Sequence, residues 1–92
     1  MRVNFYATLR PIVGQKTVEL PIVEGFTVQD VLEAIVETYP ALRAELMDEN
    51  GQLLGHVHLF INGRDAPYLD NMMATQIKAT DKIDVFPAVG GG

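Results

Sequence analysis

Hydrophobic and polar residues alternate strictly at the start of the chain. The hydrophobic positions of residues 2–9 fall on one face of an extended chain: Val3, Phe5, Ala7 and Leu9. This pattern predicts a half-buried strand. Pro11 and Gly14 then mark a turn, and a second alternation predicts the other half of a hairpin, with its hydrophobic positions at Val18, Leu20 and Ile22. Because Pro21 has no backbone N–H to donate, this strand is expected at a sheet edge.

The hydrophobic spacing changes to three and four residues in the next segment. These positions predict an amphipathic helix and are Val28, Val31, Leu32, Ile35, Val36 and Tyr39. Thr27 is placed to cap the first turn, with Asp30 three residues later as in a capping box. Pro40 ends or redirects the helix. The following hydrophobic positions predict one or two further helical turns, at Leu42, Leu46 and Met47.

Two more alternating runs complete the pattern. One predicts a third strand, through Val57, Leu59 and Ile61, that ends at the turn pair Asn62-Gly63. The other predicts the last strand, at Ile83 and Val85. Between them residues 64–80 are irregular, with hydrophobic anchors at Tyr68, Leu69, Met72, Met73 and Ile77.

This order of elements predicts an α+β fold of the β-grasp type. A mixed sheet of four to five strands is expected to pack on one main helix, with the first and last strands parallel at its centre. The length of 92 residues allows one domain, which we place at residues 1–89. Residues 90–92 are expected to form a flexible glycine tail.

Charge and composition narrow the possible partners. The net charge is −5 and the basic residues are scattered, so nucleic acid and anionic membranes are disfavoured and a basic protein partner is favoured. The absence of cysteine removes disulfides and thiolate chemistry. The first residues contain no hydrophobic stretch long enough for a signal peptide or membrane span, so a cytoplasmic protein is expected.

Few residues suggest catalysis or metal binding. His56 and His58, two apart on a predicted strand, could share a zinc ion, but a third ligand is missing unless Asp65 or Asp70 supplies it. A pair without a metal role is the simpler interpretation. The chain contains no serine and no glycine-rich phosphate loop. An enzyme with its own active site is therefore not expected, nor is a bound cofactor or metal.

The end of the chain, VFPAVGGG, offers another chemistry. Terminal residues are commonly frayed, but Gly90, Gly91 and Gly92 follow a predicted core strand directly and could thread a narrow channel in a partner. The reactive group would be the α-carboxylate of Gly92. It must be activated, for example by adenylation with ATP on a partner enzyme, before a persulfide, thiolate or amine can attack it.

Two phenylalanines suggest a docking surface. If the hydrophobic positions of the last two predicted strands face the helix, Phe60 and Phe86 project from the opposite sheet face. Exposed there, they would mark a partner site. The alternative is that residues 64–80 fold over them.

Nearly the whole chain resembles the ThiS/MoaD family of β-grasp sulfur carriers and the related small ubiquitin-like modifiers of prokaryotes. The segments that carry the resemblance are ATLRPIVGQKTVEL, GFTVQDVLEAIVETYP, ALRAELMDENG, VHLFINGRD and DKIDVFPAVGGG. It implies a ubiquitin-like fold in which a ubiquitin-activating-type enzyme uses ATP to adenylate Gly92, followed by conversion to a thiocarboxylate. It also implies that Phe60, Phe86 and Arg10 meet partners. One departure is Gly90, where many relatives carry Ala or Ser.

The resemblance leaves the pathway open. The length and the segments LRP and ELMDENG argue against thiamin synthesis. The sulfur-accepting enzyme would be a cysteine synthase or the large subunit of molybdopterin synthase, and the chain could then be that enzyme's small subunit. A modifier conjugated through Gly92 to lysines is an alternative. A binding module with an inert tail is a further one.

Overall fold

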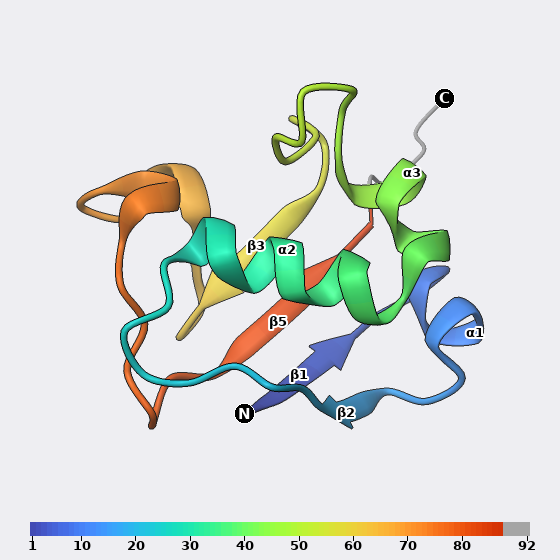
Figure 1. Ribbon diagram of the computed structural model, residues 1–92, viewed down its shortest axis with the longest axis horizontal. Coiled ribbons are helices and arrows are strands. Elements are labelled where there is room, and N and C mark those ends of the chain that lie inside the picture. The colour runs from blue at the N-terminus through green and yellow to red at the C-terminus, as the bar shows by residue number, and fades with distance from the viewer. Residues whose placement is uncertain (88–92) are drawn as a thin grey trace.

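The computed structural model describes residues 1–87, which form a sheet with one long helix across one of its faces (Figure 1). The helix is α2 (Val28–Thr38). The strands are β1 (Arg2–Phe5), β2 (Thr17–Glu19), β3 (His58–Ile61), β4 (Arg64–Asp65) and β5 (Ile83–Phe86). They lie in the order β2-β1-β5-β3-β4, with β1 and β5 parallel and the other neighbours antiparallel. The predicted β-grasp fold is confirmed, with β5 central and β2 at an edge.

The hydrophobic core lies between α2 and the sheet. Strand residues at alternate positions are fully buried beneath the helix, and they include Val3, Phe5, Leu59, Ile83 and Val85. The hydrophobic face of α2 meets them with Val31, Leu32 and Ile35, also fully buried. Each such side chain contributes roughly 1.5–3 kcal/mol by leaving water. The hydrophobic residues that alternate along the strands and those that recur every 3.6 residues along α2 therefore pack against each other in one core.

The first turn of α2 forms the predicted capping box. The Thr27 hydroxyl accepts a hydrogen bond from the Asp30 backbone N–H at 3.1 Å, and the Asp30 carboxylate accepts one from the Thr27 N–H at 2.9 Å. The chain leaves the helix before Pro40 and continues through the 3₁₀ helix η1 (Pro40–Leu42) into α3 (Arg43–Leu46). The predicted further helical turns are thus present.

The prediction of one strand over residues 2–9 is wrong in its second half. Strand β1 ends at Phe5, and a short helix, α1 (Leu9–Val13), follows. Ala7 adopts a left-handed backbone conformation, with φ of 53°, which turns the chain out of the sheet. Leu9 is buried, but it enters the core from α1 and not from a strand. A hydrophobic residue four positions after Phe5 fits either structure, so alternation alone could not separate them.

Residues 64–80 contain a short strand and two 3₁₀ helices, η2 (Ala66–Tyr68) and η3 (Met72–Ala74). Asn62 and Gly63 both have positive φ, as a two-residue hairpin turn requires, and connect β3 to β4. The segment then crosses to the helix side, where the Val28 N–H donates to the Thr75 carbonyl at 3.0 Å. Ile77 is buried in the core. The connection therefore covers the core, and the sheet face opposite α2 stays uncovered by it.

Candidate functional site

Strand β5 holds the chain in the centre of the sheet up to its end. It pairs with β1 on one side and β3 on the other, and its last residue, Phe86, lies opposite His58. The Tyr6 N–H also donates to the Val85 carbonyl at 3.2 Å, which continues the pairing beyond β1. The next residue, Pro87, is buried. The tail residues named from the sequence, Gly90, Gly91 and Gly92, lie outside the described residues.

Four aromatic rings gather on the sheet face that α2 does not cover, and we call them the aromatic face: Tyr6, His58, Phe60 and Phe86. Tyr6 and Phe86 stack with ring centroids 4.1 Å apart and planes 7° from parallel. Phe60 meets Phe86 edge to face at 5.4 Å, and His58 stacks on Phe60 at 5.7 Å. All four rings are partly exposed. The two predicted phenylalanines are thus in contact, on the face left open by residues 64–80.

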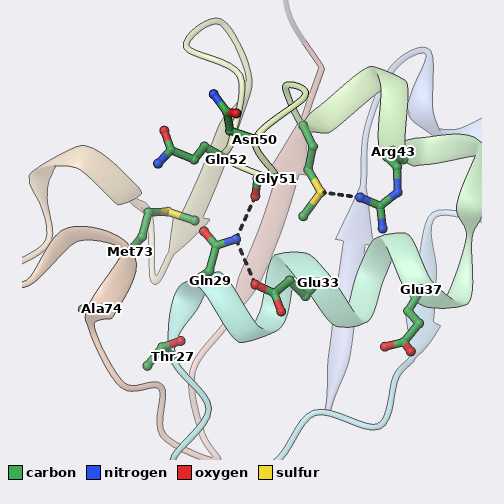
Figure 2. A pocket seen from close by; sticks show the side chains of 11 residues that line it. Thr27, Gln29, Glu33, Glu37, Arg43, Asn50, Gly51, Gln52, Met73 and Ala74 are labelled. Atoms are coloured by element: carbon green, nitrogen blue, oxygen red, sulfur yellow. Dashed lines mark hydrogen bonds between the residues drawn. The ribbon is translucent and has the colours of Figure 1, made fainter.

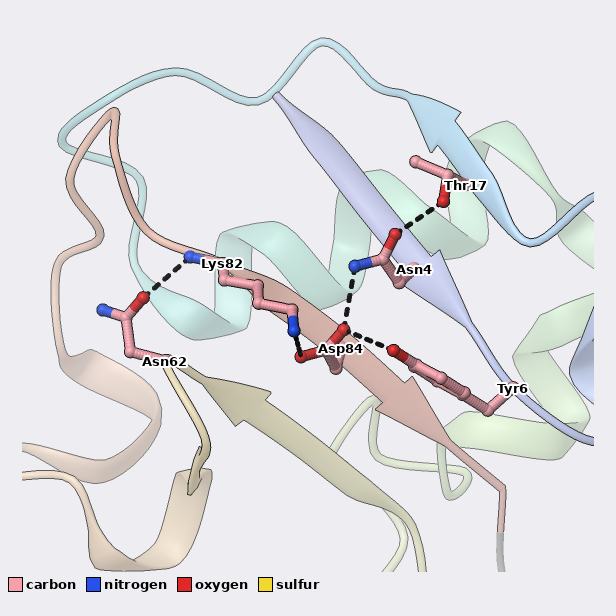
Figure 3. Close-up of polar contacts among 6 residues, drawn as sticks. All are labelled: Asn4, Tyr6, Thr17, Asn62, Lys82 and Asp84. Atoms are coloured by element: carbon pink, nitrogen blue, oxygen red, sulfur yellow. Dashed lines mark hydrogen bonds and ion pairs between the residues drawn. The ribbon is translucent and has the colours of Figure 1, made fainter.

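A nearly buried carboxylate, Asp84, lies beside this face (Figure 3). Its side chain accepts hydrogen bonds from the Asn4 amide at 2.9 Å and from the Tyr6 hydroxyl at 3.0 Å. The Lys82 ammonium lies 3.8 Å away. Only 7% of Asp84 is exposed, and these partners compensate the cost of burying its charge. The network joins β1 to β5 through side chains as well as through the backbone.

The Tyr6 side chain links this network to the aromatic face. Burial raises the pKa of its hydroxyl above the ordinary value, and the hydrogen bond to Asp84 and the charge of Asp84 raise it further. The nearby charge of Arg10 acts in the opposite direction. On the other side, the Lys16 ammonium lies 5.1 Å from the ring centroid, within reach of a cation–π interaction. The Tyr6 side chain therefore contacts Asp84 through its hydroxyl, and Phe86 and Lys16 through its ring.

Arg10, the third predicted docking residue, lies in α1 and is exposed. It is not one of the rings in contact, but its positive charge acts to lower the pKa of Tyr6, a member of the aromatic face. The Lys16 ammonium lies over the Tyr6 ring, and the Lys82 ammonium lies beside Asp84. This combination can receive both hydrophobic and acidic side chains of a partner.

His56 and His58 do not form the shared strand pair that the sequence suggested. His56 lies in a turn before β3, and the Nδ1 atom of His58 lies 2.6 Å from the Asp65 carboxylate. Within residues 1–87, no three His, Cys, Asp or Glu side chains are grouped as metal ligands. The described part of the chain thus offers no metal centre, and His58 belongs to the aromatic face.

Two residues of the site, Tyr6 and Asp84, were not singled out from the sequence. Alternation did place both on the polar side of their strands, the side that carries Phe86. Their contact could not be inferred, because it depends on the register Asn4–Asp84 between strands almost a whole chain length apart. The only feature of the sequence that could have pointed to Asp84 was a carboxylate between two hydrophobic core positions, in Ile83-Asp84-Val85.

The fold and the site define a class: a β-grasp protein with an aromatic face beside its central last strand. Residues 3–92 match the model of the ThiS family, and the chain belongs to that family. It is 38% identical over 92 residues to small archaeal modifier protein 3 of Haloferax volcanii, covering 100% of this chain and 98% of that one. The proteins of this group are small sulfur carriers or ubiquitin-like modifiers.

Solved structures show the same fold. The crystal structure of SAMP1 from Haloferax volcanii superposes with a TM-score of 0.84 at 30% identity, covering 100% of this chain and 98% of that chain. A chain of the Amycolatopsis orientalis BexX/CysO complex gives a TM-score of 0.77 at 25% identity, with coverage of 99% and 98%. Among the described residues, no helix is long and hydrophobic enough to cross a membrane.

Proposed function

We propose that this protein is a sulfur carrier whose reacting group is the terminal carboxylate of Gly92. The observation that carries the proposal is the place of β5: the strand before the glycines lies at the sheet centre, between β1 and β3, and ends beside the aromatic face. A partner that docks on this face meets the chain where it leaves the sheet. Membership of the ThiS family supports the same role.

The proposed chemistry has two steps. A ubiquitin-activating-type enzyme joins the Gly92 carboxylate to the α-phosphate of ATP, which releases pyrophosphate. A hydrosulfide ion then attacks the acyl carbon and AMP leaves, which gives the thiocarboxylate directly. When the donor is instead a persulfide, the first product is an acyl disulfide; a thiol then attacks the donor's sulfur, so that a disulfide forms and the thiocarboxylate leaves. The terminal glycine has no side chain to obstruct this attack. ATP binds the activating enzyme, and the carrier itself holds no cofactor.

Phe60 and Phe86 form the docking contact in this proposal, and Arg10 adds charge at its edge. Aromatic side chains in a preorganised cluster are common binding hot spots. Phe86 is fixed by stacking on Tyr6, so little side-chain entropy is lost when a partner covers it. Residues 1–89 then act as the docking domain and residues 90–92 as the substrate tail.

The mass of the intact protein tests the carrier function. After incubation with ATP, an activating enzyme from the source organism and a sulfur donor, exchange of oxygen for sulfur should add about 16 mass units at the terminus. A variant without Gly91 and Gly92 should gain nothing. If the full-length protein keeps its mass with every activating enzyme of the source cell, the carrier proposal is wrong.

A protein modifier is the second candidate, and the 38% identity to small archaeal modifier protein 3 favours it. Here a lysine amine of a target attacks the activated Gly92, giving an isopeptide bond and AMP. Proteolytic digests of source cells should then contain lysines that carry the glycine tail. If no such lysines are found, the modifier function is excluded and only the carrier function remains. If removal of Gly91 and Gly92 leaves cell function unchanged, the protein is a binding module with an inert tail.

The enzyme that receives the sulfur is a separate question. The candidates are a cysteine synthase and the large subunit of molybdopterin synthase. Thiocarboxylated protein mixed with each enzyme and its substrate should return to its original mass with one of them only. Consumption by neither would exclude both pathways.

A further inference from the structure

A groove with a hydrophobic lining lies beside α2; neither Phe60 nor Phe86 lines it, although Asp65 in its lining contacts His58 of the aromatic face. It has a volume of about 540 Å³ and runs between the loop before β3 and the connection from β4 to β5. Its hydrophobic side chains include Leu53, Leu54, Pro67, Met72 and Met73. No lysine or arginine lines it. Leu53, Leu54 and Met73 pack against the core but stay partly exposed in the groove, where a ligand can reach them.

Large hydrophobic side chains are unusually exposed beside the groove. Met72 is 58% exposed and Tyr68 is 77% exposed, and both belong to the connection that forms one wall. Met72 also has a φ of 48°, an unfavourable left-handed conformation for its residue type. Methionine is adaptable and common at protein-binding surfaces. The wall thus exposes hydrophobic side chains to solvent, and this exposure does not stabilise the fold.

The groove continues along α2 into a polar hollow of about 770 Å³ (Figure 2). The two share Gln29, Gln52 and Met73 in their linings. The polar hollow carries the carboxylates of Glu33 and Glu37, one helical turn apart on α2. One end of the continuous surface is therefore hydrophobic and the other end is acidic.

No ion pair within residues 1–87 involves the glutamates of the acidic end. Glu33 accepts a hydrogen bond from the Gln29 amide at 3.1 Å, and the same amide nitrogen donates to the Gly51 carbonyl at 2.9 Å. Arg43 also lines the hollow, but its guanidinium contacts the Met47 sulfur at 3.6 Å. Both carboxylates can therefore receive cations of a partner.

We propose that this surface, which we call the helix-side groove, binds a basic amphipathic segment of a partner protein. Hydrophobic side chains of that segment occupy the end at Leu54 and Met72, and its Lys or Arg side chains lie along Glu33 and Glu37. An amphipathic helix supplies this pattern, with hydrophobic anchors three or four residues apart. The net charge of −5 steers such a segment toward the protein. The inference goes beyond the carrier function, because neither Phe60 nor Phe86 lines the groove.

Nuclear magnetic resonance with a designed peptide tests the proposal. The probe is a synthetic helical peptide with leucine on one face and lysine beside it, added to the ¹⁵N-labelled protein. Saturable shifts are expected for backbone amides of the helix-side groove, such as those of Gln29, Gly51, Leu54 and Met72. A matched peptide with glutamate in place of lysine should bind at least about tenfold more weakly, since the charges then repel.

Two variants and a control refine the test. Met72→Asn should weaken peptide binding severalfold or more, and asparagine tolerates the left-handed conformation, so the fold is retained. The double change Glu33→Gln and Glu37→Gln should weaken it at low salt and reduce its salt dependence. Val23→Asn is the control, because Val23 is 60% exposed but lies outside the groove.

Several results would overturn the proposal. They are an absence of shifts at millimolar peptide, shifts confined to the aromatic face, or equal binding of the acidic peptide. Sedimentation showing a dimer that Met72→Asn dissociates would assign the groove to a second copy of this chain instead. None of these results bears on the thiocarboxylate assay, so the two proposals can fail separately.

Discussion

Tyr6 and Asp84 hold the first and last strands together on the open sheet face, with the phenol donating a hydrogen bond of 3.0 Å to the carboxylate. The same Tyr6 ring stacks on Phe86 at 4.1 Å. One side chain therefore connects a nearly buried carboxylate to a proposed docking ring. Tyr6 therefore contributes both to the stability of the sheet centre and to the fixed position of Phe86 on the aromatic face.

Asp84→Ala is expected to destabilise the protein by about 1–3 kcal/mol, because two donors lose their acceptor in a partly buried place. The free energy of unfolding in urea measures the loss. Asp70→Ala, at an exposed site, should change it by less than about 0.5 kcal/mol. Equal unfolding midpoints for the Asp84 variant and the unchanged protein would show that the network contributes nothing to stability.

The raised pKa of Tyr6 predicts a loss of stability at high pH. The folded protein holds this proton more tightly than the unfolded chain, in which tyrosine titrates near about 10. The stabilising contribution is therefore complete below that pH and lost as the pH rises through the higher folded pKa. The stability difference between the unchanged protein and Tyr6→Phe should be constant below about pH 9 and shrink above pH 10.

Tyr68→Phe, at a tyrosine that is 77% exposed and lies outside the Asp84 network, is the matched control. In Asp84→Asn the Tyr6 pKa should move down, since the charge of Asp84 is one of its causes. A Tyr6 that titrates at the ordinary tyrosine pH, followed by ¹³C resonance, would contradict the assigned network.

Phe86→Ala and Phe60→Ala are each expected to weaken binding to the activating enzyme by about 2 kcal/mol or more, as at other aromatic hot spots. The readout is the concentration of carrier that half-saturates ATP–pyrophosphate exchange. Tyr68→Ala removes an exposed ring that is not one of the four of the aromatic face, and it should have no effect. Since Phe86 also packs on Tyr6, each variant's fold is checked by its amide spectrum first. Unchanged saturation by both folded variants would exclude the aromatic face as the docking site.

Thr27→Ala should destabilise the protein by about 1 kcal/mol, because it removes the side-chain acceptor at the start of α2. Thermal and urea unfolding measure this change. Thr80→Ala, at an exposed turn, should be nearly neutral. If both variants unfold alike, the capping box contributes little.

The local patterns of the sequence were sufficient for most of the fold. Strand β3 and helix α2 with its cap were predicted because hydrophobic period and capping residues act over a few positions, and the parallel pairing of β1 with β5 was predicted from the order of the elements. The prediction failed at Ala7, where a positive φ ends the strand, and missed β4, which has two residues. Neither feature leaves a periodic signal.

The sequence by itself determined which residues line the core, which face Phe60 and Phe86 occupy, and that the chain ends in three glycines after a core strand. Only the tertiary structure decided which groups meet. The contacts of Tyr6 with Asp84, and of the 66–74 connection with the helix side, join segments that are distant along the chain. Their register depends on the packing of all the elements at once, and no local pattern of side chains specifies it.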